Sequence, residues 1–403
     1  NSNYALLDGK ANLYKCFLPL GWNIANTKGI CGFLHPEGVY DDPKGGPLRS
    51  EIYKRLKYHF QFANGLFLFQ EVHDQVRFGI NIFANSNKEV DFKIIANLFL
   101  PQTIDGSFEN FSNEVVGGIK DDNNKWNIEG HQNRILRINK ETLKLFVKLY
   151  DDEGTLYLQA RLPALHSIEL ISVLEKFSNY SQVLGGINGK YISSVMFDES
   201  KYQKENKIEK KSQFIDDIND LILNGVQFHI CNILSKTPRK VCTQNSHYDS
   251  IDISNVNIDY LPRSNFVPTV DLANNVPSVP WDSTRKFDSF YRVINREMMS
   301  SPGERTFISS IIPKNTKHIL SCVSTAFEQR SHMLEYISFG ASIVGDFFIK
   351  STGMGHTGTN LLRKLILVKD NITADMKVRI LILSCLTSHY KELYEDQYEK
   401  FFI

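Results

Sequence analysis

The sequence predicts an α/β protein in which the second half of a doubly wound sheet is followed by a mixed α+β region. The first observation is the order of segments over residues 10–100, where helical patterns alternate with short apolar runs. The second is the apolar run at residues 30–34, which ends at turn residues and is typical of a buried strand. The third is a polar, glycine-containing stretch at residues 105–130, which suits a boundary after the sheet.

The segments before that boundary are assigned from their periodicity. Residues 10–26 space their apolar side chains as a helix does, despite Pro19. Residues 49–62 resemble an amphipathic helix, because Ile52, Leu56 and Phe60 fall on one stripe. Strands are expected at residues 30–34, 67–69, 77–83 and 92–100.

The remaining segments mix both kinds of element. Five prolines within residues 236–282 predict an extended connection. Helices are expected at residues 166–177, 290–299, 332–342 and 378–390, and strands at residues 306–313 and 343–350. We therefore expect three parts, which are residues 1–115, 116–275 and 276–403.

Composition restricts the class of protein. The chain has 403 residues, of which 42% are hydrophobic and 23% charged, as in soluble globular proteins. Lys and Arg number 46 against 45 Asp and Glu, so a wholly basic nucleic-acid binder is excluded. Six cysteines without a CxxC spacing favour free thiols in the cytoplasm. No apolar run reaches the length of a membrane span, and no membrane partner is expected.

No self-contained catalytic motif stands in a convincing context, so no catalytic residue is predicted in this chain. The glycine-rich run at residues 185–189 lacks a strand before it and a helix after it, which favours a turn. Glu37, Asp41 and Asp42 have a spacing that a metal could use, but a structural turn explains them better and no metal is predicted.

The segment from His35 to Gly46, called here the polar loop, follows the first expected strand. Its prolines fix φ and its glycines allow bends, and in open α/β sheets ligands lie beyond the carboxyl ends of strands. We expect it to form the rim of a pocket, either by turning the chain or by tracking DNA. The rim residues are expected to be His35, Pro36, Glu37, Tyr40, Asp41, Asp42 and Lys44.

The polar loop and its surroundings resemble large adenine-specific DNA methyltransferases of class I, including type IIG enzymes and the methylases of DISARM- and BREX-like phage-defence systems. The resemblance rests mainly on four stretches in the first hundred residues, with Tyr4 to Leu7 and Arg55-Leu56 beside them, and is looser over residues 277–390. The stretches are Asn12-Leu13-Tyr14-Lys15-Cys16-Phe17-Leu18, the polar loop, His59-Phe60-Gln61-Phe62 and Phe69-Gln70-Glu71-Val72.

The resemblance implies a Rossmann-like catalytic domain that transfers a methyl group from S-adenosylmethionine to adenine in double-stranded DNA. In that family an Asn-Pro-Pro-aromatic motif holds the base, and an earlier glycine-rich motif binds the cofactor. This sequence contains neither motif. We therefore expect a C-terminal part of the enzyme, inactive alone, with the cofactor bound mainly elsewhere. Methyl transfer by the purified chain would contradict this expectation.

The resemblance also places an aromatic ring on the second side of the base pocket. Phe69 is the expected stacking residue, with Phe67 as the alternative. Phenylalanine at alternate strand positions is also typical of a core, and that alternative stays open. An extruded base needs such a ring because it must leave the duplex before it can react.

DNA contacts are expected from basic residues at two places. Lys44 and Arg49 adjoin the polar loop, and a second group lies among aromatic residues near the end of the chain. Basic and aromatic residues together suit phosphate binding, whereas neighbouring carboxylates equally suit a salt-bridged helix surface. The second group is Arg285, Arg292, Arg296 and Arg305.

Two rival functions share these features. One is a bifunctional restriction-modification enzyme with a nuclease in another part of the protein. The other is a non-catalytic DNA-specificity subunit with a degenerate methylase fold, although such a subunit would not need the intact match over Asn12 to Gly46. Other subunits of a defence system are further expected partners.

Overall fold

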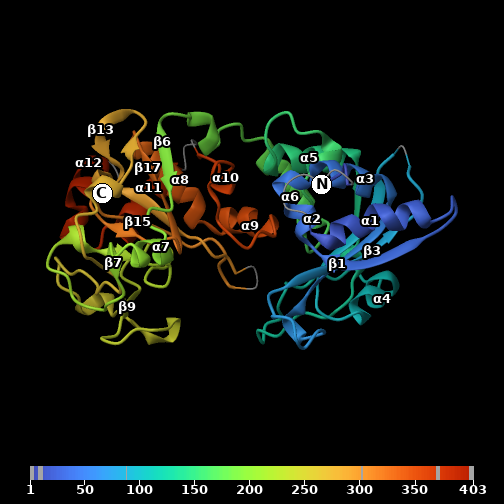
Figure 1. Ribbon diagram of the computed structural model, residues 1–403, viewed down its shortest axis with the longest axis horizontal. Coiled ribbons are helices and arrows are strands. Elements are labelled where there is room, and N and C mark those ends of the chain that lie inside the picture. Colours follow the sequence, from blue (N-terminus) through green and yellow to red (C-terminus); the bar gives the residue numbers. More distant parts are fainter. Residues whose placement is uncertain (1–3, 8–11, 88, 301–302, 369–372, 399–403) are drawn as a thin grey trace. The chain divides into compact units, whose positions relative to one another are not determined.

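The computed structural model describes residues 4–7, 12–87, 89–300, 303–368 and 373–398. The chain is a mixed α/β protein with mixed sheets, and it divides into two compact units (Figure 1). Unit 1 comprises residues 1–180 and 351–353, and unit 2 comprises residues 181–350 and 354–403. The boundaries expected near residues 115 and 275 lie inside unit 1 and unit 2, respectively.

Unit 1 is built on a five-stranded sheet with the order β1-β3-β2-β4-β5. Strands β1 and β2 are both antiparallel to β3, β2 is parallel to β4, and β4 is antiparallel to β5. The carboxyl ends of β1, β2 and β4 therefore meet at one edge, called here the carboxyl edge. The strands are β1 (Cys31–Pro36), β2 (Leu56–Ala63), β3 (Arg77–Phe83), β4 (Asp91–Leu98) and β5 (Leu136–Asn139).

Helices connect and cover this sheet. Helix α3 carries the chain from β1 to the parallel strand β2, and β3 occupies the position between the two strands. The rings of Phe62 and Phe78 stack 5.4 Å apart and join Ile95 and Leu98 in a core cluster. The α-helices of unit 1 are α1 (Leu13–Ile24), α2 (Gly38–Asp41), α3 (Gly46–Arg55), α4 (Gln102–Glu109), α5 (Lys140–Tyr150) and α6 (Glu169–Ser178).

Three expectations for unit 1 were wrong. The helix expected over residues 49–62 ends at Arg55, because the following residues alternate polar and aromatic side chains and form β2. The strand expected at residues 67–69 is a loop. The run at residues 30–34 belongs to the edge strand β1 rather than a buried strand, and Leu34 is 56% exposed.

Unit 2 contains an antiparallel four-stranded sheet with the order β15-β14-β17-β6. Short two-stranded ladders surround it. The sheet strands are β6 (Tyr191–Ser194), β14 (Arg292–Arg296), β15 (Ser309–Ile312) and β17 (Cys322–Phe327). The ladder strands are β7 (Ile208–Glu209), β8 (Ile222–Leu223), β9 (Lys236–Pro238), β10 (Tyr248–Ser250), β11 (Val267–Pro268), β12 (Ser278–Val279), β13 (Asp282–Lys286) and β16 (Lys317–His318).

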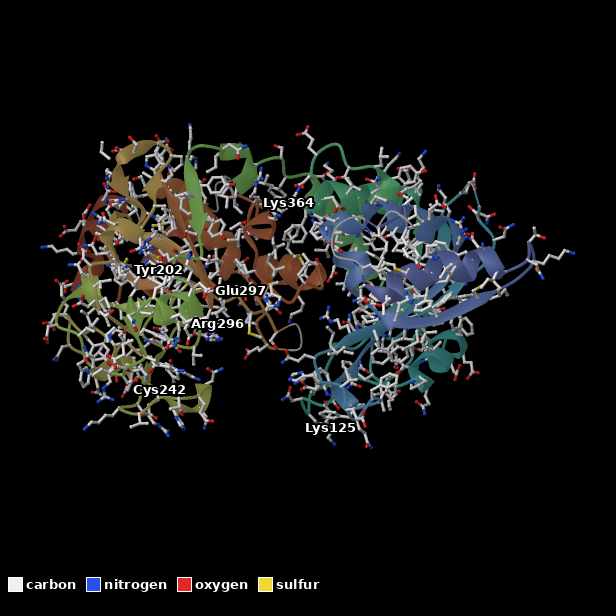
Figure 2. The ribbon with its side chains drawn as sticks, viewed as in Figure 1. Lys125, Tyr202, Cys242, Arg296, Glu297 and Lys364 are labelled. Atoms are coloured by element: carbon white, nitrogen blue, oxygen red, sulfur yellow. The ribbon has the colours of Figure 1, made fainter. Side chains whose placement is uncertain are left out.

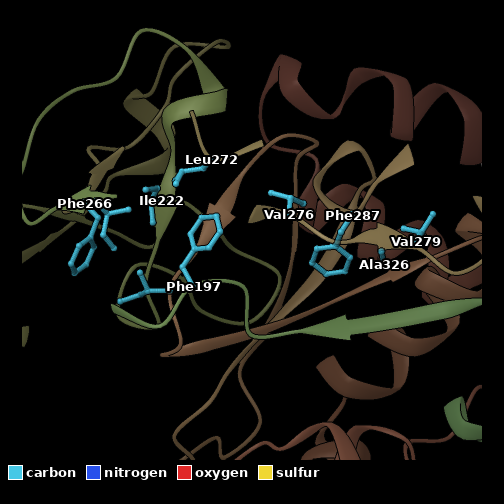
Figure 3. Close-up of a cluster of buried hydrophobic side chains, with 10 residues drawn as sticks. Phe197, Ile222, Phe266, Leu272, Val276, Val279, Phe287 and Ala326 are labelled. Carbon is cyan, nitrogen blue, oxygen red and sulfur yellow. The ribbon is translucent and has the colours of Figure 1, made fainter. Parts of the chain in front are cut away.

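Most helices of unit 2 follow the strands of the sheet in the sequence. A buried apolar cluster fills the interior of unit 2. The α-helices are α7 (Glu199–Lys204), α8 (Arg330–Ala341), α9 (Ile343–Ser351), α10 (Thr359–Leu362), α11 (Thr373–Ser384) and α12 (Lys391–Gln397). Figure 3 shows the cluster, whose side chains come from both the ladders and the sheet. Its labelled members are Phe197, Ile222, Phe266, Leu272, Val276, Val279, Phe287 and Ala326.

Two expectations for unit 2 were wrong. Residues 290–299 contain strand β14 instead of a helix, because Val293 and Ile294 are buried on opposite faces of the central sheet. Residues 343–350 form helix α9 instead of a strand. The hydroxyl of Ser342 accepts a hydrogen bond from the Gly345 N–H, 2.9 Å away, and so caps the start of that helix.

Candidate functional site

Three segments of unit 1 meet at the carboxyl edge. Strand β1 ends at Pro36, which pairs with Phe78, and β2 ends at Ala63, which pairs with Arg77 at the start of β3. The polar loop and the loop after β2 therefore begin side by side. Ligands of α/β sheets bind at such an edge, which makes it the candidate functional site.

A buried polar network centred on Asn81 holds the start of the polar loop. Its Oδ1 accepts hydrogen bonds from Tyr40 Oη at 2.6 Å and from His59 Nδ1 at 2.8 Å. Its Nδ2 donates to His35 Nε2 and to the Gly79 carbonyl, both at 3.0 Å. All four polar side chains are buried. The network fixes the chain where it leaves β1.

The tautomer of His35 follows from these partners. Its Nδ1 donates to the Pro36 carbonyl at 2.8 Å, which leaves Nε2 to accept from Asn81. Burial lowers the pKa of His35, so the ring stays neutral. The ring of Tyr14 stacks on it with centroids 5.1 Å apart. His35 is therefore a fixed wall of the site rather than a charged group.

Glu37 is a buried carboxylate at the end of this network. Its Oε2 lies 3.2 Å from both His59 Nε2 and Gln61 Nε2. Its Oε1 has no hydrogen-bond partner among the described residues. A Cβ atom at position 79 would lie 2.3 Å from that oxygen, so a larger residue there would displace the carboxylate. The carboxylate thus sits directly against the backbone of β3.

The rest of the polar loop is tied to the body of unit 1. Asp42 accepts hydrogen bonds from Lys15 Nζ at 2.7 Å and from the Lys44 N–H at 2.9 Å. Burial would raise the pKa of Asp42, but these two hydrogen bonds outweigh it and lower the pKa. Pro36, Asp41 and Lys44 are exposed on the outside of the loop. The loop is a rigid turn with a polar outer surface.

Arg49 does not lie on that outer surface. Its side chain is buried, with 1% of the residue exposed. The guanidinium donates to the carbonyls of Val39 at 3.0 Å, Asp42 at 2.6 Å and Gln159 at 3.0 Å. The expectation that Arg49 contacts the DNA backbone does not fit this burial, and its place in the structure is to hold the polar loop.

The loop after β2, residues 64–73, is called here the aromatic loop. The side chain of Asn64, fully buried, holds it from inside. Its Nδ2 donates to the carbonyls of Phe69 at 2.9 Å and Val72 at 2.6 Å, and its Oδ1 accepts from the Phe69 N–H at 3.0 Å. Phe67 has a φ of 52°, a conformation that costs energy for an aromatic residue.

This fixed loop exposes a run of apolar side chains at the carboxyl edge. Leu66, Phe67, Leu68 and Phe69 are 42%, 54%, 38% and 42% exposed. Phe69 packs edge to face on Phe78, with centroids 5.0 Å apart. Adjacent apolar side chains held outward by a strained, hydrogen-bonded loop are typical of a binding surface. Phe69, the expected stacking residue, is therefore both anchored and accessible.

Of the four arginines expected to bind DNA from the second region, three are held by backbone carbonyls of unit 2. Arg292 is fully buried and donates to the Thr316 carbonyl, and burial lowers its pKa to about 10. Arg296, at the end of β14 beside Glu297 (Figure 2), donates to the Phe228 carbonyl at 2.5 Å. Arg305 donates to the Ala341 carbonyl at 2.6 Å. Arg285 alone among the four is exposed.

Four residues that define the site were not predicted as site residues, although two of them lie in a stretch that carries the resemblance. They are His59, Gln61, Gly79 and Asn81, and they pair across strands as His59 with Asn81 and Gln61 with Gly79. A sequence signal existed, because each strand carries polar residues or glycine at positions i and i+2, which face one side of a sheet. The sequence gives no comparable signal for Asn64, because its hydrogen-bond partners depend on the conformation of the aromatic loop.

Among the described residues, no group of three or more His, Cys, Asp or Glu side chains could hold a metal ion. The described helices include none that is long and apolar enough to cross a membrane. All six cysteines are free thiols. The site therefore consists of the buried polar network, the polar loop and the aromatic loop.

No protein-family model and no curated protein matches this chain. Among solved structures it is similar to the one described as "Characterization and crystal structure of the type IIG restriction endonuclease BpuSI", with 12% sequence identity and a TM-score of 0.28. The match covers 93% of this chain and 44% of that chain, so this chain spans less than half the length of that protein. The likeness is weak.

Proposed function

We propose that this chain forms part of a site-specific DNA methyltransferase that transfers a methyl group from S-adenosylmethionine to the exocyclic amine of adenine in duplex DNA. This chain would supply one wall of the base pocket and part of the surface that recognises DNA. The observation that carries the proposal is the rigid aromatic loop, which exposes Phe67 and Phe69 at the carboxyl edge. The sequence resemblance supplies the reaction.

An adenine in a duplex is stacked and paired, so an enzyme must extrude it before its amine can react. The extruded base loses its stacking neighbours, and an aromatic side chain replaces them. Phe69 suits this role because its backbone N–H and carbonyl both bind Asn64 and its ring rests on Phe78. Phe67 is more exposed; its N–H donates to the Asn64 carbonyl at 2.7 Å, but its ring has no partner ring among the described residues. Phe69 is therefore the proposed stacking residue.

The polar loop would lie beside that base as the rim of the pocket. His35 lies at the end of β1 and Glu37 directly after it, and the aromatic loop follows β2. Strand β3 lies between β1 and β2 and pairs with both. The conformations of His35 and Glu37 are set by the buried network before any ligand arrives. A preformed rim reduces the ordering cost of binding.

The described residues do not fit the cofactor as well as they fit a base. The polar loop joins β1 to α3, but its glycines do not have the G-x-G-x-x-G spacing of a dinucleotide-type turn, and the run at residues 185–189 overlaps a 3-10 helix (Leu184–Ile187) of unit 2. In the proposed enzyme, S-adenosylmethionine would be held mainly by residues outside this chain and would supply the electrophilic methyl group. This chain would bind, orient and shield the base.

The stacking role predicts a preference for DNA with an unpaired adenine, whose extrusion costs less. The chain should bind a duplex with one unpaired adenine roughly ten times more tightly than the fully paired duplex, since one base–aromatic stack contributes about 1–3 kcal/mol. Phe69→Ala should remove most of this preference. Fluorescence anisotropy with both duplexes at one salt concentration measures it.

Phe111→Ala is the matched control, because Phe111 is 71% exposed and lies outside the aromatic loop. This variant should keep the preference of the unaltered chain. A Phe69→Ala variant that still prefers the unpaired adenine would count against the proposal.

A further inference from the structure

A second feature of interest lies entirely within unit 2, at one end of its four-stranded sheet. It is a pocket of about 110 Å³ whose lining includes three cations, Arg285, Lys314 and Arg330. Its floor includes the aromatic rings of Phe290, Tyr291 and Phe327. Tyr291 precedes β14, Lys314 follows β15, Phe327 ends β17 and Arg330 begins α8.

The cations are held in place by the aromatic rings. The guanidinium carbon of Arg285 lies 4.0 Å from the ring centroid of Phe290. Lys314 Nζ and the guanidinium carbon of Arg330 lie 5.3 Å and 5.5 Å from the centroid of Tyr291. These are distances at which a cation is attracted to a ring face. Three positive charges against one lining carboxylate, Glu328, favour an anionic ligand.

Two carboxylates of α12 already neutralise part of this charge. Glu392 bonds to Lys314 Nζ at 2.5 Å and also to Arg330, and Asp396 bonds to Arg330 at 2.7 Å. The side chains of Glu392 and Asp396 are 55% and 51% exposed, whereas those of Lys314 and Arg330 are 31% and 28% exposed. These four groups form one network, but its two carboxylates are about half exposed, so dissolved anions can reach and compete for the cations. An external anion can therefore displace the carboxylates.

We propose that this pocket receives one phosphate of the DNA backbone, and that Glu392 and Asp396 occupy the place of that phosphate until DNA binds. A guanidinium and an ammonium are the side-chain groups that bind phosphate best. Pockets for whole small molecules measure about 300–1,000 Å³, so a space this small suits a single phosphate group. That the phosphate belongs to DNA rests on the proposed function.

The test compares Glu392→Gln with Glu395→Gln. Both changes remove one negative charge from α12, but Glu395 pairs with Lys391 of the same helix, at 3.8 Å, and not with a lining cation. In the full chain, Glu392→Gln should bind a duplex of about 20 base pairs roughly three to ten times more tightly than Glu395→Gln. Equal affinities would overturn the proposal.

A second pair of replacements tests whether the gain in DNA affinity depends on the cations of the pocket. When Lys314 and Arg330 are both replaced by Gln, Glu392→Gln should no longer strengthen binding. The double replacement alone should also flatten the slope of log affinity against log salt by about one, the value for one lost phosphate contact. A gain that survives the double replacement would place its origin elsewhere and contradict the proposal.

Inorganic phosphate separates this proposal from the proposed function. Phosphate should raise the melting temperature of Glu392→Gln more than that of Glu395→Gln. If no variant binds DNA yet phosphate gives this difference, the phosphate site is supported while its assignment to DNA and the proposed function are overturned. If all variants bind DNA alike and phosphate gives no difference, the pocket proposal is overturned and the proposed function stands.

Discussion

Replacement of Arg49 by methionine is expected to destabilise unit 1 by about 3–5 kcal/mol. The guanidinium is buried and donates to the carbonyls of Val39, Asp42 and Gln159. Methionine fills a similar space but removes the donor to the carbonyls of Val39 and Gln159, whereas the Asp42 carbonyl keeps the Gly45 N–H at 2.9 Å. Each buried unsatisfied acceptor costs about 1–3 kcal/mol before relaxation. Urea unfolding followed by circular dichroism measures the loss.

Lys54→Met is the matched control on the same helix. Lys54 pairs with Glu51 one turn away, at 2.7 Å, with 31% of its side chain exposed. Its removal should cost about 0.5 kcal/mol or less. An Arg49→Met variant as stable as this control, with a flatter salt dependence of DNA binding, would contradict the structural role and restore Arg49 as a phosphate contact.

Acidification should destabilise both units, starting below about pH 6.5. His318 in unit 2 and His166 in unit 1 are buried, and burial, with a nearby arginine in each case, lowers the pKa of both to about 3. The unfolded chain binds a proton at each histidine near pH 6.5, whereas the folded chain does not. Stability therefore rises with pH between about 3 and 6.5, and falls on acidification by about 1.4 kcal/mol per pH unit for each histidine.

The expected loss at pH 5 is about 2 kcal/mol per histidine relative to pH 7. His318→Gln should lower this loss for unit 2, because glutamine keeps a polar group near Ser324 and does not titrate. His73→Gln is the control, since the His73 side chain is 72% exposed. Urea unfolding at pH 7, 6 and 5 gives the slopes. Equal slopes for His318→Gln and the unaltered chain would show that His318 is not the group responsible.

The sequence predicted those elements whose pattern is local. Strands β3 and β4 were expected at nearly their observed positions, because alternation over seven or eight residues is readable without knowledge of the partners. Strand β2 was missed because Ile52, Leu56 and Phe60 continue a helical stripe across the point where α3 ends. Strand β14 was missed because a strand buried on both faces shows no alternation.

The candidate site was predictable only in part, for a similar reason. The polar loop and Phe69 were singled out, and the structure places both at the carboxyl edge. The Asn81 network depends on the register between β2 and β3, which the sequence does not reveal. From the sequence, Arg49 and Arg292 were expected to be surface cations. The backbone carbonyls that accept their hydrogen bonds, and so allow their burial, belong to residues distant in the sequence. Partners of that kind leave no pattern in the sequence.

The central claim, that the aromatic loop contacts an extruded base, is tested most directly by photochemical crosslinking. A duplex carrying 5-iododeoxyuridine as its single unpaired base is bound to the full chain and irradiated, which joins the base to an aromatic ring stacked on it. We expect the crosslinked tryptic peptide to span residues 58–77 and to carry the base on Phe69. Crosslinks confined to residues outside the aromatic loop would show that this loop does not contact the base.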